Sequence, residues 1–316
     1  MNILANDGIA NSGKVLLEQA GHKVVTETVA QENLIDAINN ENYEVVLVRS
    51  ATTVRKEVMD ACPNLRMIGR GGVGMDNIDV EYGRSKGLHV FNTPAASSQS
   101  VAELVMTQLF SLVRMTYDAN KEMPVNGATE FKKLKKKYGK GLELRGKTLG
   151  IVGFGRIGQA VAQYAIGCGI NVIAHDPFVD KAEINLNLQG KPFSVSIGTI
   201  GMDELMANSD FISLHVPKQA DGSAVIAANE FAKMKDGVYL VNIARGGVIE
   251  ESDLLAALDS GKVAACALDV FENEPTPDTA LLTHAKIATT PHIGAATLEA
   301  QDRIGEELAN FIIGNS

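Results

Sequence analysis

Three residues in the last quarter of the chain have side chains suited to proton transfer on an anionic substrate. Arg245, Glu274 and His292 each follow a short apolar segment that reads as a β-strand. An arginine can hold a carboxylate through two parallel hydrogen bonds. A histidine can exchange a proton near neutral pH, and a carboxylate beside it favours its charged form. Taken singly, an arginine in the place of Arg245 is more often a surface charge, and a histidine beside a proline, like His292 beside Pro291, is more often a structural residue.

A glycine-rich turn lies upstream of these residues. Gly153, Gly155 and Gly158 follow the apolar segment Leu149–Val152 and precede a helix-like run that starts at Gln159. Between a strand and a helix, such glycines permit the turn, the close approach of backbone to a pyrophosphate and the packing of helix on strand. The helix N-terminus then offers free N–H groups to the phosphates. The pattern predicts a dinucleotide site.

Asp176 is the candidate for binding the adenosine ribose. It ends the next predicted strand, 18 residues after Gly158, close to where dinucleotide-binding folds place an acidic residue. A carboxylate there accepts hydrogen bonds from both ribose hydroxyls and repels a 2′-phosphate, and no arginine directly follows it. The sequence therefore favours NAD over NADP. The alternative is an aspartate that only starts the turn before Pro177.

Segments rich in valine and isoleucine alternate with helix-like stretches in two series. This alternation predicts an α/β protein with two doubly wound parallel sheets. The strands expected in the first series are Asn2–Ala5, Lys23–Glu27, Glu44–Arg49, Met67–Arg70 and His89–Asn92. Those expected in the second series are Thr148–Gly153, Asn171–His175, Phe211–His215, Val238–Ile243, Ala264–Val270 and Ile287–Thr290. The candidate catalytic residues follow strands of the second series, at the edge where such sheets bind ligands.

The helices expected between and after these strands include Asn11–Ala20, Gln31–Asn39 and Leu298–Ile313. The segment Ser98–Met115 is apolar on more than one side, which favours a subunit interface. The alternative is a helix buried within its own domain. The stretch Lys121–Gly141 is polar and rich in lysine, so we expect an exposed connection into the second domain.

The composition limits the classes of partner. The 316 residues include 29 Lys and Arg against 38 Asp and Glu, and the net charge of −9 disfavours nucleic acids and anionic membranes. Hydrophobic residues make up 45%, as in folded globular proteins. Three cysteines without motif spacing, no signal peptide and no long apolar run predict a cytoplasmic protein without disulfides. We expect no metal site.

Four motifs occur in order along the chain: the glycine turn, Asn242–Ile249, Asp269–Pro275 and Pro291–Thr297. Together they resemble the D-isomer-specific 2-hydroxyacid dehydrogenases over nearly the whole chain. The resemblance implies hydride transfer to NAD, with His292 as the acid/base, Glu274 as its partner and Arg245 on the substrate carboxylate. The cofactor contacts that it implies are Gly153, Gly155, Arg156, Ile157, Gly158, Asp176, Val216, Pro217, Ile243, Ala244, Asp269, His292, Gly294 and Ala295.

The family fold implies that the first domain is discontinuous. Residues 1–97 and 292–316 are then a flavodoxin-like substrate domain, and residues 98–291 are a Rossmann NAD-binding domain inserted between them. The resemblance also implies a cleft between the two domains that closes about a hinge. The apolar segment Ser98–Met115 favours a homodimer formed through the cofactor domain.

The N-terminal half is similar to D-3-phosphoglycerate dehydrogenases in particular, through Val48–Thr52, Gly69–Asp79 and Asn92–Pro94. This similarity implies oxidation of D-3-phosphoglycerate to 3-phosphohydroxypyruvate, the first step of serine biosynthesis. In this family, basic residues of a neighbouring subunit can complete the phosphate site, and lysines 132–137 are candidates. Their alternative is a solvated helix face. The substrate-binding residues that the similarity implies are Arg49, Ser50, Arg70, Gly72, Val73, Gly74, Asn77 and Lys135.

Some features depart from the family's usual pattern. Ser97 stands where asparagine is common, and Val216 where threonine is common. The chain ends at Ser316, so the expectation is a short form without the C-terminal regulatory domain. Three other functions stay open: a glyoxylate or hydroxypyruvate reductase without phosphate-binding cations, an NAD-sensing corepressor-like protein and a formate dehydrogenase. The pair of Glu274 and His292 argues against the last, because formate oxidation moves no hydroxyl proton.

Overall fold

Each of two units of the chain is built around a parallel β-sheet. The computed structural model describes residues 1–316, apart from the side chain of Leu188. Residues 1–100 and 295–316 form the first unit, and residues 101–294 form the second. The sequence places the boundaries after Ser97 and Pro291, whereas the contacts place them after Ser100 and Gly294. The C-terminal segment therefore returns to the first unit.

Five parallel strands form the sheet of the first unit, in the flavodoxin-like order β2-β1-β3-β4-β5. They are β1 (Asn2–Ala5), β2 (Lys23–Val25), β3 (Val45–Val48), β4 (Met67–Arg70) and β5 (His89–Asn92). The central strand β3 is buried along its whole length, because helices cover both faces of the sheet. The helices are α1 (Asn11–Gln19), the 3-10 turn η1 (Gln31–Asn33), α2 (Leu34–Asn40), α3 (Lys56–Ala61), α4 (Val80–Ser85) and α12 (Leu298–Gly314).

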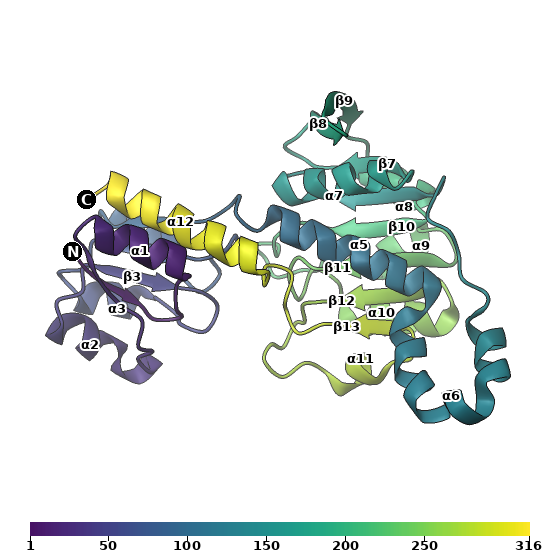
Figure 1. Cartoon of the computed structure of the whole chain (residues 1–316), viewed down its shortest axis with the longest axis horizontal. Coiled ribbons are helices and arrows are strands. Elements are labelled where there is room, and N and C mark those ends of the chain that lie inside the picture. Colours follow the sequence, from purple (N-terminus) through teal and green to yellow (C-terminus); the bar gives the residue numbers. More distant parts are fainter. The chain divides into compact units, whose positions relative to one another are not determined.

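Helix α12 completes the first unit by packing against α1 (Figure 1). The two backbones approach closely where Gly13 faces Gly305, since a β-carbon on Gly13 would overlap the carbonyl group of Gly305. Elsewhere on α12, Ile304 lies in the core, and the ring of Phe311 stacks on Phe91 with 3.9 Å between ring centroids. The two ends of the chain thereby share one core.

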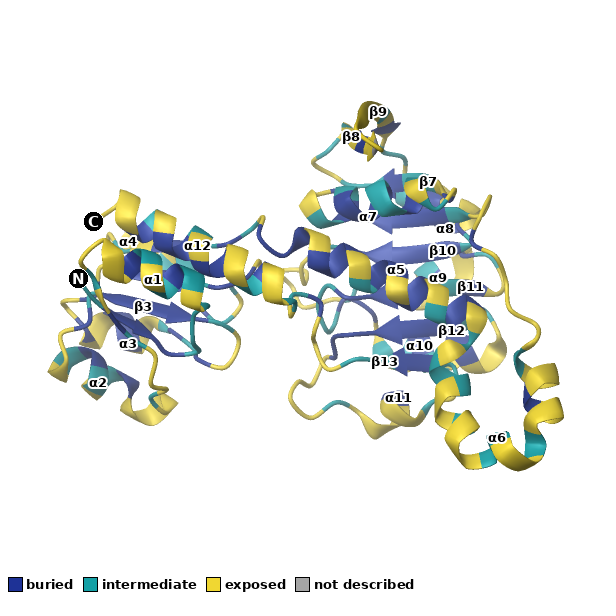
Figure 2. Ribbon diagram, viewed as in Figure 1, coloured by how far each residue is buried: buried dark blue, intermediate teal, exposed yellow. Residues whose placement is uncertain are grey.

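Six parallel strands form the sheet of the second unit, in the order β13-β12-β11-β10-β6-β7 (Figure 1). They are β6 (Thr148–Val152), β7 (Asn171–His175), β10 (Phe211–Leu214), β11 (Val238–Asn242), β12 (Val263–Leu268) and β13 (Ile287–Thr289). Figure 2 shows these strands as a buried layer. Helices α5 (Ser98–Arg114) and α7 (Arg156–Gly167) cover one face, and α8 (Met202–Asn208), α9 (Ala228–Lys233) and α10 (Glu251–Ser260) cover the other. The short helix α11 (Thr279–Thr283) precedes β13. This arrangement is a Rossmann domain.

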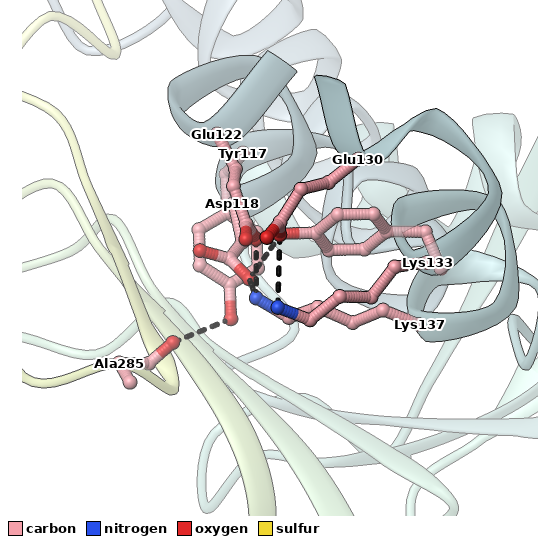
Figure 3. Close-up of polar contacts among 8 residues, drawn as sticks. Tyr117, Asp118, Glu122, Glu130, Lys133, Lys137 and Ala285 are labelled. Carbon is pink, nitrogen blue, oxygen red and sulfur yellow. Dashed lines mark hydrogen bonds and ion pairs between the residues drawn. The ribbon is translucent and has the colours of Figure 1, made fainter. Parts of the chain in front are cut away.

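The stretch Lys121–Gly141 is largely exposed, as the sequence indicates, but most of it belongs to a helix of the second unit rather than to a connection between the domains. Residues Thr116–Tyr138 form helix α6, which bends near its middle into two arms. Lys137 of the second arm pairs with Asp118 and Glu122 of the first arm, at 3.2 and 2.5 Å (Figure 3). These ion pairs join the two arms of the helix. Because the arms are polar, hydrophobic periodicity does not reveal them, and the sequence pattern does not predict the helix.

A β-hairpin follows β7, where the sequence reading expects no strand. β8 (Lys181–Leu188) and β9 (Lys191–Gly198) pair antiparallel, and the turn between them has positive φ at Gln189 and Gly190. Ile184 of β8 is buried in the hydrophobic core that also contains the apolar residues of α7. Alternation of polar and apolar residues along β8 is the pattern that predicts such a hairpin.

No helix in the described part of the chain is long and apolar enough to cross a membrane. Among the described residues, no group of histidine, cysteine, aspartate or glutamate side chains could hold a metal ion.

Candidate active site

The glycine turn joins β6 to α7 in the second unit. Gly153 has a φ of 91°, and a β-carbon there would lie 2.5 Å from the carbonyl oxygen of His215. A β-carbon on Gly158 would overlap the carbonyl oxygen of Gly153. At Gly155, nothing in the described part of the chain lies within 4 Å of that position. Packing therefore requires glycine at the two ends of the turn, and the middle glycine faces open space that a phosphate can enter.

The N-terminus of α7 is open to an anion. Its N-cap residue, Gly155, has no side chain that could bond the free N–H groups of the first turn. Asp176, just after β7, accepts hydrogen bonds from the N–H groups of Phe154, at 2.7 Å, and Phe178, at 2.8 Å. Its carboxylate is thus fixed beside the glycine turn, and each oxygen keeps a lone pair for a ribose hydroxyl. The residues present fit the pyrophosphate and ribose of NAD.

His292 and Glu274 form a hydrogen-bonded pair. Nδ1 of His292 lies 2.7 Å from Oε2 of Glu274, and the two side chains are 43% and 36% exposed. The other carboxylate oxygen of Glu274 accepts the N–H of Phe271 at 2.9 Å, so the carboxylate is held from two sides. A carboxylate on Nδ1 fixes the proton there and leaves Nε2 to exchange a proton with a substrate.

Asp269 holds the loop that carries His292. It is 1% exposed. Its carboxylate accepts hydrogen bonds from the hydroxyl of Thr290, at 2.6 Å, and from the N–H groups of Ile293, at 2.9 Å, and Gly294, at 2.8 Å. His292 has a φ of 53°, in the left-handed region that is unfavourable for residues other than glycine. The three bonds stabilise this conformation, so Asp269 fixes the place of the imidazole.

Arg245 lies in the turn that follows β11. The side-chain oxygen of Asn242 accepts the N–H of Ala244 at 3.0 Å, and its side-chain nitrogen donates to the carbonyl oxygen of Arg245 at 2.9 Å. The guanidinium donates to the carbonyl oxygen of Ala244 at 2.7 Å. A β-carbon on Gly246 would overlap the carbonyl group of Phe271. The Arg245 turn therefore packs directly on the turn that follows β12.

The other predicted cofactor residues are spread over the same edge of the second sheet. Val216 packs beside Gly153 and Ile243 beside Gly294, since β-carbons on these glycines would lie 2.9 and 2.8 Å from those side chains. The remaining positions in this unit are exposed at Arg156 and Pro217 and half-buried at Ile157 and Ala244. Ala295 lies in the first unit.

The predicted substrate residues of the first unit lie at the end of β4 and in the loops after β3 and β4. The carboxylate of Asp7 accepts the N–H of Arg49 at 2.6 Å and the hydroxyl of Thr52 at 2.5 Å. The side-chain nitrogen of Asn77 donates to the carbonyl oxygens of Arg49 and Thr52, at 2.8 and 2.6 Å. Asn77 thus shapes the loop that carries Arg49 and the exposed Ser50. Asp7 also shapes this loop. It is not among the predicted residues, although its place two residues after the end of β1 puts it at the ligand-binding edge of the sheet.

The glycine loop after β4 has its own internal contacts. The N–H of Gly72 donates to the hydroxyl oxygen of Thr93 at 2.8 Å, and a β-carbon on Gly72 would overlap the guanidinium of Arg70. Among the described residues, the N–H groups of Val73 and Gly74 have no hydrogen-bond partner. A carboxylate can therefore use these two backbone donors.

The predicted lysine cluster divides into two groups. Lys133 pairs with Glu130 at 2.8 Å, and Lys137 pairs with the acids of the first arm of α6 (Figure 3). Of the other three, Lys135 and Lys136 follow Lys132 by three and four positions, which places them on the same side of the second arm as Lys132. Within this cluster, the lysines without an ion-pair partner in the described part of the chain are Lys132, Lys135 and Lys136.

Comparison with known proteins places this geometry in a family. Residues 106–294 match the D-isomer specific 2-hydroxyacid dehydrogenase NAD binding domain. The chain is 38% identical to the D-3-phosphoglycerate dehydrogenase of Archaeoglobus fulgidus over 99% of its own length and 57% of that protein. It is 42% identical to the hydroxypyruvate reductase of Thermotoga maritima over 95% of its own length and 92% of that protein. The chain thus spans little more than half of the first relative.

Solved structures agree in fold. A glyoxylate reductase from Paecilomyes thermophila superposes with a TM-score of 0.82 at 29% identity, covering 99% of this chain and 94% of that one. An NAD-dependent formate dehydrogenase from Staphylococcus aureus, solved with NAD, gives a TM-score of 0.79 at 27% identity, covering 99% and 94%. The chain belongs to the D-isomer-specific 2-hydroxyacid dehydrogenases, and residues 106–294 contain the NAD-binding domain of that family.

Proposed function

We propose that the protein oxidises D-3-phosphoglycerate to 3-phosphohydroxypyruvate with NAD, the first step of serine biosynthesis. The observation that carries the chemistry is the 2.7 Å contact between His292 and Glu274, in the same unit as Arg245 and the glycine turn. Similarity to D-3-phosphoglycerate dehydrogenases over almost the whole chain supports the substrate.

In the proposed reaction, Arg245 holds the substrate carboxylate and Nε2 of His292 takes the hydroxyl proton. The C2–H bond breaks with its electron pair as the C2–O bond becomes a carbonyl. NAD held at the glycine turn and Asp176 would supply the acceptor for that hydride. Glu274 stabilises the imidazolium that forms. In the reverse direction the same imidazolium returns the proton to the oxygen of the 2-oxo acid.

The phosphate of this substrate needs cations that an unphosphorylated acid does not. We assign Arg49 and Arg70 to it, because both lie in the first unit at the ends of strands. We also assign Lys135 of a second copy, because its ammonium has no ion-pair partner in the described part of the chain. The N–H groups of Val73 and Gly74 then support the carboxylate together with Arg245.

A reductase of unphosphorylated hydroxypyruvate is the second candidate. The Thermotoga maritima relative favours it, because that hydroxypyruvate reductase matches this chain over nearly the full length of both proteins. Such an enzyme would use His292, Glu274 and Arg245 in the same roles. Its substrate has no phosphate for Lys135 to bind.

Initial rates of NADH oxidation with 3-phosphohydroxypyruvate, hydroxypyruvate and glyoxylate test the proposal. We expect kcat/KM for the phosphorylated acid to be about 10- to 100-fold higher, as one or two charge-assisted hydrogen bonds provide. Lys135→Ala should raise KM for that acid alone, and Lys133→Ala, whose lysine pairs with Glu130, should leave it unchanged. Equal or better turnover of hydroxypyruvate by the wild type would favour the second candidate. No turnover of any of the three acids would contradict both.

A further inference from the structure

Asn242 connects the turn that carries Arg245 with the loop that carries His292. It is the last residue of β11 and is 2% exposed. Its side chain bonds to both sides of the Arg245 turn, accepting from the N–H of Ala244 and donating to the carbonyl oxygen of Arg245. Its own carbonyl oxygen accepts the N–H of Asp269 at 3.0 Å. One buried residue therefore contacts both the Arg245 turn and Asp269, whose carboxylate holds the loop that carries His292.

Asp269 continues this path to the imidazole. Its carboxylate binds the N–H groups of Ile293 and Gly294, directly after His292. A continuous series of hydrogen bonds thus runs from Arg245 to the His292 loop across the ends of β11, β12 and β13. Every bond in it joins groups within the second unit.

The Arg245 turn also has little freedom to move. Gly246 lies with its backbone against the carbonyl group of Phe271, and the N–H of Phe271 holds Glu274 at 2.9 Å. A shift of the turn toward this neighbour would therefore disturb the partner of His292. A shift away from it is opposed by the two side-chain bonds of Asn242.

We propose that Asn242 is a positioning residue that keeps Arg245 in register with His292. The inference rests on the proposed function, in which Arg245 holds the substrate carboxylate while His292 exchanges the proton. Only an amide supplies an acceptor toward Ala244 and a donor toward Arg245 from one short side chain. Aspartate keeps the acceptor and loses the donor, and alanine loses both.

The test compares Asn242→Asp and Asn242→Ala with the wild type. In both variants we expect kcat/KM for 3-phosphohydroxypyruvate to fall about 10- to 100-fold, the effect of a small misplacement of a substrate-binding group. The Kd for NADH, measured by fluorescence, should not change. Relative to the wild type at the same pH, Asn242→Asp should regain activity as the pH falls, because the introduced carboxyl becomes a donor when protonated. Asn242→Ala should show no such recovery.

A double-mutant cycle shows whether Asn242 acts through Arg245. In an Arg245→Ala background, Asn242→Asp should cause almost no further loss, because the group that it positions is already gone. Additive losses would overturn the inference, as would unchanged kcat/KM in the single variants or a parallel loss of NADH binding.

The control is Asn208→Ala, since Asn208 donates to the carbonyl oxygen of Glu204 within α8 and should leave kcat/KM unchanged. If Asn242→Ala does not fold, Asn242→Asp carries the test alone, because it preserves the shape of the side chain. A wild type that turns over none of the acids would overturn the proposed function and the inference with it. A wild type with normal turnover and additive variants would overturn the inference alone.

Discussion

The two directions of the proposed reaction need different protonation states of the His292 imidazole. Oxidation needs a neutral imidazole that can take a proton, and reduction needs the imidazolium. A second histidine at the ligand-binding edge of the sheet should not contribute to the pH dependence, because desolvation lowers the pKa of His215 to about 3. Its Nε2 lies 2.8 Å from Oγ of Ser213, and the ring stays neutral over the working range.

We therefore predict opposite pH profiles for the two directions. As pH rises, kcat/KM for oxidation should rise and kcat/KM for reduction should fall, because the two directions need opposite protonation states of the imidazole. His292→Ala should reduce kcat by about 10²- to 10⁴-fold, the usual contribution of an acid/base group. His215→Gln serves as the control and should keep both profiles. The same trend in both directions would count against His292 as the group that transfers the proton.

A second prediction at the residue scale concerns Asp176. Replacing it by asparagine keeps an oxygen that can accept the N–H of Phe154 but removes the negative charge. The preference for NADH over NADPH should then fall by about 10-fold or more, since contact between like charges opposes binding by at least a kcal/mol. Fluorescence titration of both nucleotides measures it. An unchanged ratio of the two Kd values would refute the ribose-binding role.

At the scale of elements, the parallel strands could be predicted because apolar runs are read directly from the sequence. Their carboxyl ends carry Arg245, Glu274 and His292, so the candidate site follows from the same pattern. Helix α6 and the β8–β9 hairpin could not be found this way. The arms of α6 are held by ion pairs between polar residues. The role of Asp7 likewise depends on Arg49 and Thr52, which are far away in sequence.

The contact between α1 and α12 is an element-scale feature that a single substitution can test. Gly13→Ala would place a methyl group on the carbonyl group of Gly305, so the helices would have to separate. We predict a loss of about 1–3 kcal/mol in the free energy of unfolding, as for other overpacked cores. Urea denaturation measures the change.

The matched control for Gly13→Ala is Gly314→Ala in α12. No atom in the described part of the chain lies within 4 Å of a β-carbon at Gly314. Alanine there should be neutral or stabilising by a few tenths of a kcal/mol, because it reduces the freedom of the unfolded chain. Equal effects of the two substitutions would show that the close approach of α1 and α12 does not limit stability.

At the scale of the whole molecule, helix α5 divides its apolar residues between two faces. Val105, Leu109 and Leu112 are buried in the second unit, which agrees with a helix packed in its own domain. On the other side Phe110 is 46% exposed, and Leu142 beyond the end of α6 is 43% exposed. Phe110 lines a hollow of about 410 Å³ together with Thr107, Ser111, Arg114 and Thr116. We propose that this face meets a second copy in a homodimer.

Sedimentation velocity tests the dimer through Phe110→Glu. A charge in place of an aromatic anchor should weaken association by about 2 kcal/mol or more, roughly 30-fold in Kd. The control is Phe193→Glu on β9, because Phe193 is similarly exposed, at 42%, but lies on the hairpin rather than on α5. Only Phe110→Glu should shift the protein toward monomer, and the Kd for NADH should stay the same in both variants, since the glycine turn and Asp176 lie elsewhere in the unit. A monomeric wild type, or equal behaviour of the two variants, would remove α5 from consideration as the interface. A monomeric wild type would also contradict the proposed contact between Lys135 of a second copy and the substrate phosphate.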